Sequence, residues 1–425
     1  MKDNYKIVQQ LFYLVAIVYS LQYLGTILKS DLIKYVAVVA QIYLLILTFT
    51  TIKKNARNIN WHGIPPLLYM VFLFPLIRIF GNVIYDLSVR NFIDGILING
   101  SYYLLGFTGM AMASISNSLN IFKLVYKFGL ITFPLAIIIF ILPIFNFTSE
   151  YKQFTGLLVI VSFLIPIATL VLRPINNKYS TLGWFAIFAI LYMSSVVSSR
   201  SYTLVGVYFI ILALKYHLSK QRTFVVLFLL LIFYGSYSIG LFDFLNKKAE
   251  TQEISMSDKF RFNELFKTFD KFTEDGDITR IFYWEGNSRS EILIDAFGKF
   301  TIEDWIFGRG IFGRYVSFTN RHTIEIGLAQ EIFRWGLPYG ILSLYFFINT
   351  YIKLKKRRLI SRNPTIHLLY SIVLIKILDM FVYGMPESSP YTLLMFWAMM
   401  CLYVKGNRLI DSNVNGSIKN KLASA

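Results

Sequence analysis

The stretch Tyr35-Val-Ala-Val-Val-Ala-Gln-Ile-Tyr-Leu-Leu-Ile-Leu-Thr-Phe-Thr-Thr-Ile52 contains no charged side chain. As an α-helix it would span about 27 Å, close to the ~30 Å thickness of the hydrocarbon core of a bilayer. Runs of this kind recur along a chain of 425 residues that is 56% hydrophobic, 17% aromatic and 16% charged. This composition is typical of membrane proteins and excludes an ordinary soluble globular domain.

The recurring apolar runs predict an all-α polytopic membrane protein with about twelve transmembrane helices. The predicted spans are residues 10–28, 32–52, 64–84, 95–115, 125–146, 154–172, 181–198, 201–217, 223–242, 324–352, 365–384 and 389–404. Lys2 and Lys6 precede the first span without a small-residue cleavage site. We therefore expect this span to remain as an anchor rather than to be removed as a signal peptide.

A polar segment of about 80 residues interrupts the apolar pattern and is far longer than any other connection. It divides the chain into three parts. Residues 1–242 form an N-terminal membrane block of about nine spans, residues 243–322 a loop containing short helices, and residues 323–425 a C-terminal membrane block of about three spans. Because long loops in compact proteins are usually functional, we expect reactive groups in or beside residues 243–322.

Lysine and arginine residues gather in connections that alternate along the chain. The clusters are Lys53, Lys54 and Arg57; Lys123 and Lys127; Arg173 and Lys178; Lys215, Lys220 and Arg222; and the run Lys353-Leu-Lys-Lys-Arg-Arg358. The positive-inside rule places all of them in the cytoplasm. Both termini then lie inside, and the loop 243–322 faces the periplasm. Because the net charge of +18 is explained by these membrane-orienting clusters, we expect no nucleic-acid partner.

Arg200 lies in Ser198-Ser-Arg-Ser-Tyr202, between two apolar spans and at the predicted outer surface. An arginine at membrane depth is costly unless it faces a polar cavity or a partner, so Arg200 is a functional candidate. Tyr202 is a candidate supporting residue. The alternative is an arginine exposed in a tight outer turn.

Arg289 lies in Ser288-Arg-Ser-Glu291, which has the spacing of a helix capping box and predicts a helix that runs to about Phe300. The first turn of a helix attracts anions through its free N–H groups, and arginine adds a bidentate donor for phosphate oxygens. Arg289 is therefore a phosphate-binding candidate, and Glu291 a supporting one. A surface arginine near a helix cap is the alternative.

The segment Gly308-Arg-Gly-Ile-Phe-Gly313 matches the G-x-G-x-x-G pattern of dinucleotide-binding proteins by letter. No strand precedes it and no βαβ unit surrounds it, so the context that the pattern requires is missing. We interpret it as a glycine turn that leads back to the membrane.

His322 is the only histidine that the predicted topology places on the outer face. It opens a span that also carries Glu331 and Arg334, which are candidate supporting residues. They are i,i+3 neighbours on a helix and are expected to pair. A histidine without such a partner is near neutral at physiological pH and can act as a general base. The alternative is a structural histidine.

The outer face has no cluster of residues with zinc-ligand spacing and no D-x-D motif near a span end, so no metal is expected in the site. Two arginines and a histidine suit the cleavage of a phosphate-linked donor. The arginines would hold the leaving pyrophosphate while the histidine deprotonates the attacking hydroxyl. No cofactor is expected.

This arrangement resembles the bacterial O-antigen polymerase and O-antigen ligase group. The likeness rests on Ser199-Arg200-Ser201, on Arg289 followed by a short helix and Trp305-Ile-Phe-Gly-Arg-Gly310, and on His322 followed by Glu331-x4-Gly336-x3-Gly340. The resemblance implies a GT-C-like helical fold in the bacterial inner membrane. It also implies a metal-independent inverting glycosyltransferase in which Arg200 and Arg289 bind diphosphate and His322 is catalytic.

The substrate implied by the resemblance is an undecaprenyl-diphosphate-linked oligosaccharide, and the implied partners are the lipid bilayer, a chain-length regulator and a flippase. Polymerase activity is the preferred hypothesis. His322 is followed by Thr323 where the group would have Asn or Ser, which leaves the choice between polymerase and ligase open. A ligase would transfer polymer to lipid A core. A lipid-linked oligosaccharide flippase or transporter is an alternative from another class.

Overall fold

The computed structural model describes residues 2–27, 30–85, 95, 100–115, 120–128, 293, 296–310, 327–361, 364–382 and 390–404. Within these ranges the chain forms helices and no strand, and one isolated β-bridge joins Ile59 to Val404. The predicted all-helical fold class is therefore confirmed for the part of the chain that the structure describes.

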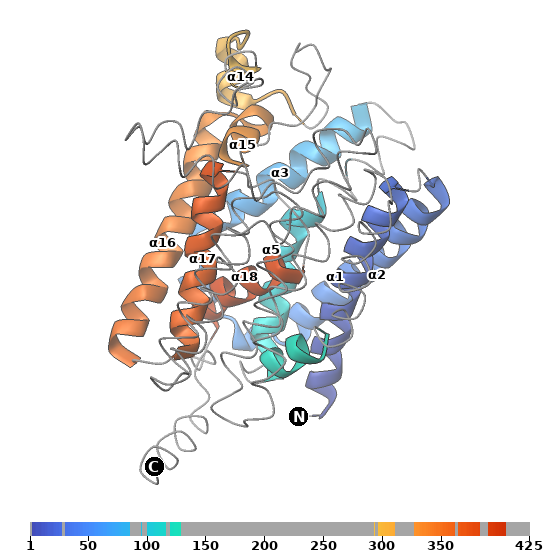
Figure 1. The fold of residues 1–425 in the computed structure, drawn as a ribbon, viewed down its shortest axis with the longest axis vertical. Helices are drawn as coiled ribbons and strands as arrows, with labels where there is room; N and C mark the ends of the chain where they lie inside the picture. Colours follow the sequence, from blue (N-terminus) through green and yellow to red (C-terminus); the bar gives the residue numbers. More distant parts are fainter. Residues whose placement is uncertain are drawn as a thin grey trace, which may run out of the picture. The chain divides into compact units, whose positions relative to one another are not determined.

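The helices are shown in Figure 1. The N-terminal ones are α1 (Lys2–Ile27), α2 (Asp31–Lys54), η1 (Ala56–Asn58), η2 (Trp61–Gly63), α3 (Pro66–Tyr85) and α5 (Ser101–Ile115). The C-terminal ones are α14 (Ile302–Phe307), α15 (Gly327–Trp335), α16 (Leu337–Ser361), α17 (Pro364–Val382), α18 (Pro390–Met400) and η8 (Cys401–Tyr403). All of them belong to one compact unit, residues 1–124 and 283–425, while residues 125–282 form a second unit.

The α1–α2 hairpin supplies the clearest membrane signal. Within the described ranges, α2 is the helix that is long and apolar enough to cross a membrane, and it coincides with the predicted span 32–52. Only 22% of its apolar window is buried. The exposed large side chains of α2 are Leu32, Tyr35, Val36, Val39, Ile42, Tyr43, Ile46 and Phe49. This pattern indicates association with a membrane, since water does not favour so many exposed apolar groups on one helix.

The core of the unit lies around α5 and α18, which come from opposite ends of the chain and pack against each other (Figure 1). Nearly every residue of α5 is buried, as expected for a helix that is apolar on all sides. Phe396 of α18 lies edge-on to Phe72 of α3 at 5.1 Å and to Tyr102 of α5 at 5.4 Å. Helices from the N-terminal and C-terminal parts of the described chain therefore share one core.

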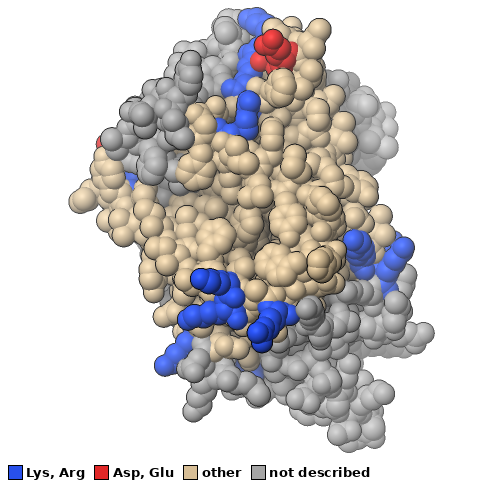
Figure 2. Space-filling model, turned by 180° about the vertical axis from the view of Figure 1, so that it is seen from behind, with Lys and Arg blue, Asp and Glu red and all other residues tan. Residues whose placement is uncertain are grey.

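Basic side chains gather at one end of the unit. Lys53 and Lys54 end α2, and the carbonyl of Tyr403 accepts a bond from the Asn60 amide just beyond it. The ammonium of Lys353 on α16 lies 5.9 Å from the centre of the Tyr403 ring. We call Lys53, Lys54, Arg57, Lys353 and Lys355 the basic end. On the face that Figure 2 draws, basic side chains of the described residues gather below a broad band without charge, and both basic and acidic side chains lie toward the opposite end.

The predicted span 324–352 is wrong as a single helix, because the structure divides it at Gly336. The φ angle of Gly336 is +92°, a conformation that an α-helix cannot include. The Gly336 amide still closes α15 by donating to the Ile332 carbonyl. Helix α16 then starts at Leu337 and continues past the predicted end to Ser361. Along the axis of α16, Lys353 lies about 24 Å from Leu337. The length of α16 therefore separates α15 from the basic end.

Candidate functional site

Only two of the predicted site residues lie in the described ranges. They are Glu331 and Arg334, both in α15. The others, namely Arg200, Tyr202, Arg289, Glu291 and His322, lie outside the described residues. The site is therefore built from the segments that follow Arg289 and His322 in the sequence, which are residues 296–310 and 327–340.

Helix α14 is a short helix held by a complete capping box. The Thr301 hydroxyl accepts a bond from the Asp304 amide at 3.2 Å, and the Asp304 carboxylate accepts one from the Thr301 amide at 3.1 Å. Arg309 then returns to the same carboxylate, with Nε and Nη2 donating at 3.2 and 3.1 Å. Desolvation raises the pKa of Asp304, but the Thr301 amide and Arg309 outweigh it, so the pKa lies below its ordinary value.

Arg309 has contacts on every side of its guanidinium. Besides Asp304, its Nη2 donates to the Lys299 carbonyl at 2.7 Å. The planar group lies over the Phe300 ring at 5.0 Å and the Phe333 ring at 6.0 Å. Such stacking and bidentate bonding suit the flat guanidinium fork. Arg309 is therefore a structural residue that ties α14 to α15.

The turn after α14 packs directly on the end of α15. The amides of Arg309 and Gly310 donate to the carbonyls of Phe333 and Arg334, both at 2.9 Å. Gly308 has a φ angle of +70°, and a Cβ atom there would collide with the backbone of Arg334. A Cβ atom on Gly336 would collide with the Ile306 carbonyl. We call this contact between residues 306–310 and 333–336 the glycine junction. It joins the two sequence motifs that contain Gly308 and Gly336.

A buried polar chain lies beneath the glycine junction. The indole Nε1 of Trp335 donates to the Tyr103 hydroxyl at 2.7 Å, and this hydroxyl donates to Oε1 of Glu331 at 3.5 Å. All three residues are at most 3% exposed. On the neighbouring turn the Tyr339 hydroxyl donates to the Val71 carbonyl at 2.8 Å. These bonds tie α15 and the start of α16 to α5 and α3.

The predicted pairing of Glu331 with Arg334 is wrong: no ion pair or hydrogen bond between these two side chains is present in the described structure. The Glu331 carboxylate instead accepts from Tyr103 on another helix. Arg334 and the buried Lys376 of α17 still supply positive charge near this carboxylate. The physical reason is tertiary: Tyr103 lies within hydrogen-bond reach of Glu331, and sequence spacing within α15 cannot reveal a partner on α5.

The structure adds one residue that the sequence analysis missed. Arg78 lies in α3 and donates from Nη2 to the Phe307 carbonyl at 3.2 Å, at the end of α14. One turn further along α3, the Asn82 amide group lies against Gly310. The signal was present in the sequence, because Arg78 is a single arginine within the predicted span 64–84. The rule on arginines at membrane depth that selected Arg200 also selects Arg78.

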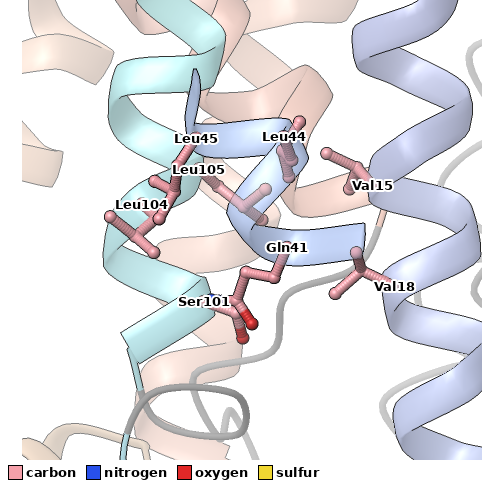
Figure 3. Close-up of a pocket in the computed structure, with 8 residues that line it drawn as sticks. All are labelled: Val15, Val18, Gln41, Leu44, Leu45, Ser101, Leu104 and Leu105. Atoms are coloured by element: carbon pink, nitrogen blue, oxygen red, sulfur yellow. The ribbon is translucent and has the colours of Figure 1, made fainter. Parts of the chain in front are cut away.

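A small cavity lies elsewhere in the unit, between α1, α2 and α5 (Figure 3). It is a narrow hollow that is partly open to the surroundings, and its walls are apolar apart from Gln41 and Ser101. Near it the Gln22 side chain donates to the Ser101 hydroxyl at 3.4 Å. Since no acid or base lines the cavity to activate the Ser101 hydroxyl, it is not a candidate for catalysis.

Comparisons with known proteins give no further assignment: no family model matches the chain, and no curated protein matches it.

Proposed function

We propose that the protein is a glycosyltransferase of the bacterial inner membrane that polymerises lipid-linked oligosaccharide repeat units, as do the O-antigen polymerases that its motifs resemble. The observation that carries the proposal is the glycine junction. The motif around Trp305–Gly310 and the motif around Glu331–Gly336 are separated in sequence by His322, and in the described structure their backbones are bonded to each other. Contact between these motifs supports the view that they serve one site.

The positive-inside rule supports an outer location for this site. The basic end would lie in the cytoplasm, and α16 then carries the chain across the bilayer to the glycine junction on the outer side. The proposed topology has both termini inside, about twelve spans and a GT-C-like arrangement.

The topology can be tested with paired single-cysteine variants in a background in which the native Cys401 is replaced by Ala. Ile302 is 79% exposed on α14, and Lys355 is exposed at the basic end. An impermeant maleimide added to outer-permeabilised cells should label Ile302→Cys and leave Lys355→Cys unlabelled until the cells are lysed. Labelling with the opposite preference would reject the orientation.

The proposed chemistry needs no metal. His322 would remove the proton from the hydroxyl of the acceptor sugar, and the hydroxyl oxygen would attack the anomeric carbon of the donor. The bond from that carbon to the phosphate oxygen breaks, and the lipid diphosphate leaves as an anion held by Arg200 and Arg289. Attack opposite the leaving group inverts the anomeric configuration. Glu331 supports the site from below through its bond to Tyr103.

The decisive experiment is incubation of the purified protein with an undecaprenyl-diphosphate-linked repeat unit, followed by gel analysis of the products. A ladder that persists in EDTA is expected. A ladder lost in EDTA and restored by Mg²⁺ would reject the metal-free mechanism. A single transfer to lipid A core would identify a ligase, and unchanged substrate with movement across a vesicle membrane would identify a transporter. The chain-length regulator and the flippase are proposed partners rather than requirements for this assay.

Substitution of each proposed site residue should lower the reaction rate by an amount that depends on its role. His322→Ala should lower the rate by about 10²- to 10⁴-fold while leaving donor binding intact, since general-base catalysis contributes on this order. Arg200→Ala and Arg289→Ala should each lower it by about 30- to 1,000-fold, and lysine should rescue poorly because it lacks the planar fork. Normal ladders from all three folded variants would reject the site assignment.

A further inference from the structure

Three separate segments of the chain meet at the basic end. Ile59 forms a β-bridge with Val404, and the Asn60 amide donates to the Tyr403 carbonyl at 2.9 Å. The ammonium of Lys353, on α16, lies 5.9 Å from the centre of the Tyr403 ring. The turn that follows α2, the second half of α16 and the residues after α18 are therefore held together around Tyr403.

The five cations of the basic end are all exposed, and none of them takes part in an ion pair within the described residues. The three segments that meet there lie in the stretches 32–85, 332–378 and 388–410, and none of these stretches contains Asp or Glu. Exposed cations that gather on one surface without carboxylates between them create a positive potential that attracts anions. The basic end is therefore a surface that suits a negatively charged partner.

The exposed apolar face of α2 leads directly to one of these cations. Ile46, Phe49 and Lys53 are exposed and lie at positions i, i+3 and i+7, so they share one face of the helix. This is the face of a helix that is apolar enough to cross a membrane and is mostly not covered by protein. A lipid that lies against it would place its tail beside Ile46 and Phe49 and its phosphate beside Lys53.

Helix α16 shows the same order of side chains at the same end. Ile348, Ile352 and Lys355 are exposed and lie at positions i, i+4 and i+7. The Lys355 ammonium lies 5.8 Å from the centre of the Tyr351 ring. Trp61, in the turn between α2 and α3, adds an exposed aromatic side chain of the kind that gathers where a membrane meets water. Two helices therefore end an apolar face with a lysine at the level expected for lipid headgroups.

We infer that the basic end binds anionic phospholipids in preference to zwitterionic ones. Lys53 and Lys355 contact the lipid phosphates at the ends of their apolar faces, and Arg57 and Lys353 add positive charge from the segments that meet at Tyr403. A soluble anion would gain nothing from the apolar faces, and an acidic protein would match the charges but not the apolar side chains that lead to them. A phospholipid matches both. The binding does not depend on glycosyl transfer.

The test uses the full-length protein in detergent, with phosphatidylglycerol as the probe and phosphatidylcholine of the same acyl chains as the reference. Native mass spectrometry measures the dissociation constant of the first bound lipid. The variant Lys53→Gln/Lys355→Gln should weaken phosphatidylglycerol binding about fivefold, which is the effect of one basic residue near an anionic surface, and leave phosphatidylcholine binding unchanged. The variant Lys53→Arg/Lys355→Arg keeps both charges and should bind as the wild type does. Lys299→Gln is the matched control, because this exposed lysine lies beside the acidic first turn of α14.

Salt provides a test that needs no substitution. Raising ammonium acetate from about 0.1 M to 1 M shortens the screening length from about 10 Å to 3 Å, so the preference for phosphatidylglycerol should disappear. Equal affinity of the wild type for the two lipids at low salt would overturn the inference. So would unchanged phosphatidylglycerol binding in the double glutamine variant with an unaltered melting temperature. Displacement by an equal concentration of glycerol 3-phosphate would assign the surface to a soluble anion instead.

The outcome is independent of the proposed function. Lysine-dependent binding of phosphatidylglycerol by a protein that makes no ladder would retain the lipid surface and reject the polymerase. A ladder made by a protein that binds both lipids equally well would reject the lipid surface alone.

Discussion

Helix α2 and the glycine junction are held in place by different kinds of interaction. Most of the apolar window of α2 faces away from the protein, and its side chains need only be apolar to suit a bilayer. The glycine junction depends on particular atoms: backbone bonds to Phe333 and Arg334, positive φ angles at Gly308 and Gly336, and the Tyr103 chain beneath. We therefore expect many substitutions to be tolerated in α2 and few in the junction.

The largest effect is expected at Gly336. Gly336→Ala places a Cβ atom against the Ile306 carbonyl in a backbone conformation that L-residues avoid. The expected loss is about 3 kcal/mol or more of stability, together with the proposed polymerising activity. Thermal unfolding of the detergent-solubilised protein measures it. Gly81→Ala is the matched control, because its Cβ would meet nothing within 4 Å and helical alanine is favoured. Equal melting temperatures for both variants would contradict the close packing described for the junction.

A smaller effect is expected at Tyr103. Tyr103→Phe removes the hydroxyl that accepts from Trp335 and donates to Glu331, and it leaves both buried groups unsatisfied. The expected cost is about 1–3 kcal/mol. In the double variant Tyr103→Phe/Glu331→Leu, the total loss of stability should be less than the sum of the losses in the two single variants. The reason is that a leucine at position 331 would no longer need the hydrogen bond that Tyr103 provides to Glu331. Strict additivity in the thermal unfolding of the four proteins would show that the two side chains do not interact.

Asp304 provides a pH-dependent test of the junction. Its folded-state pKa is lowered, so its contribution is complete above the ordinary value of about 4 and is lost as the pH falls through the folded-state value. Hydrogen exchange of the α14 amides should be slower in the wild type than in Asp304→Asn at pH 7, by a factor that corresponds to about 1 kcal/mol of capping. The difference should shrink below pH 4. A difference that grows on acidification would have the wrong sign for this ion pair.

The smallest effect is expected on the exposed face of α2. Val39 is 67% exposed, and Val39→Leu keeps an apolar side chain in the same surroundings. We expect a change in stability of less than about 0.5 kcal/mol. Val39→Lys should reduce the amount of protein inserted in the membrane, because a charge near the centre of a span costs about 3 kcal/mol. Equal insertion of both variants, measured by membrane fractionation, would place this face in water or against protein.

Several elements could be predicted because they depend on local composition. The span 32–52 became α2, and the span 64–84 corresponds to α3, which runs from Pro66 to Tyr85. Apolar length alone is enough for these. The span 324–352 could not be predicted correctly, since the break at Gly336 depends on its contact with Ile306 across the junction. A single glycine in an apolar run does not by itself indicate that a helix ends there.

The candidate site was less accessible to sequence reasoning than the helices. Glu331 and Arg334 were selected as charged residues in an apolar segment, but the hydrogen-bond partner of Glu331 is Tyr103, which is 228 positions away. Arg78 is a single arginine within a predicted span, which is the feature that selected Arg200, but the sequence analysis did not select Arg78. Its bond to the Phe307 carbonyl spans 229 positions, so only the folded chain could link it to the α14 end.

The sequence by itself determined that the protein is helical, that α2 is apolar enough to cross a membrane and that basic residues cluster in separate connections, since hydrophobicity and charge are properties of each segment alone. The tertiary structure decided which segments meet. It brought Lys53 and Lys353 to one end and joined residues 306–310 to residues 333–336 at the other. These contacts depend on the backbone approach that Gly308 and Gly336 allow and on hydrogen bonds between distant helices, neither of which is encoded in local composition.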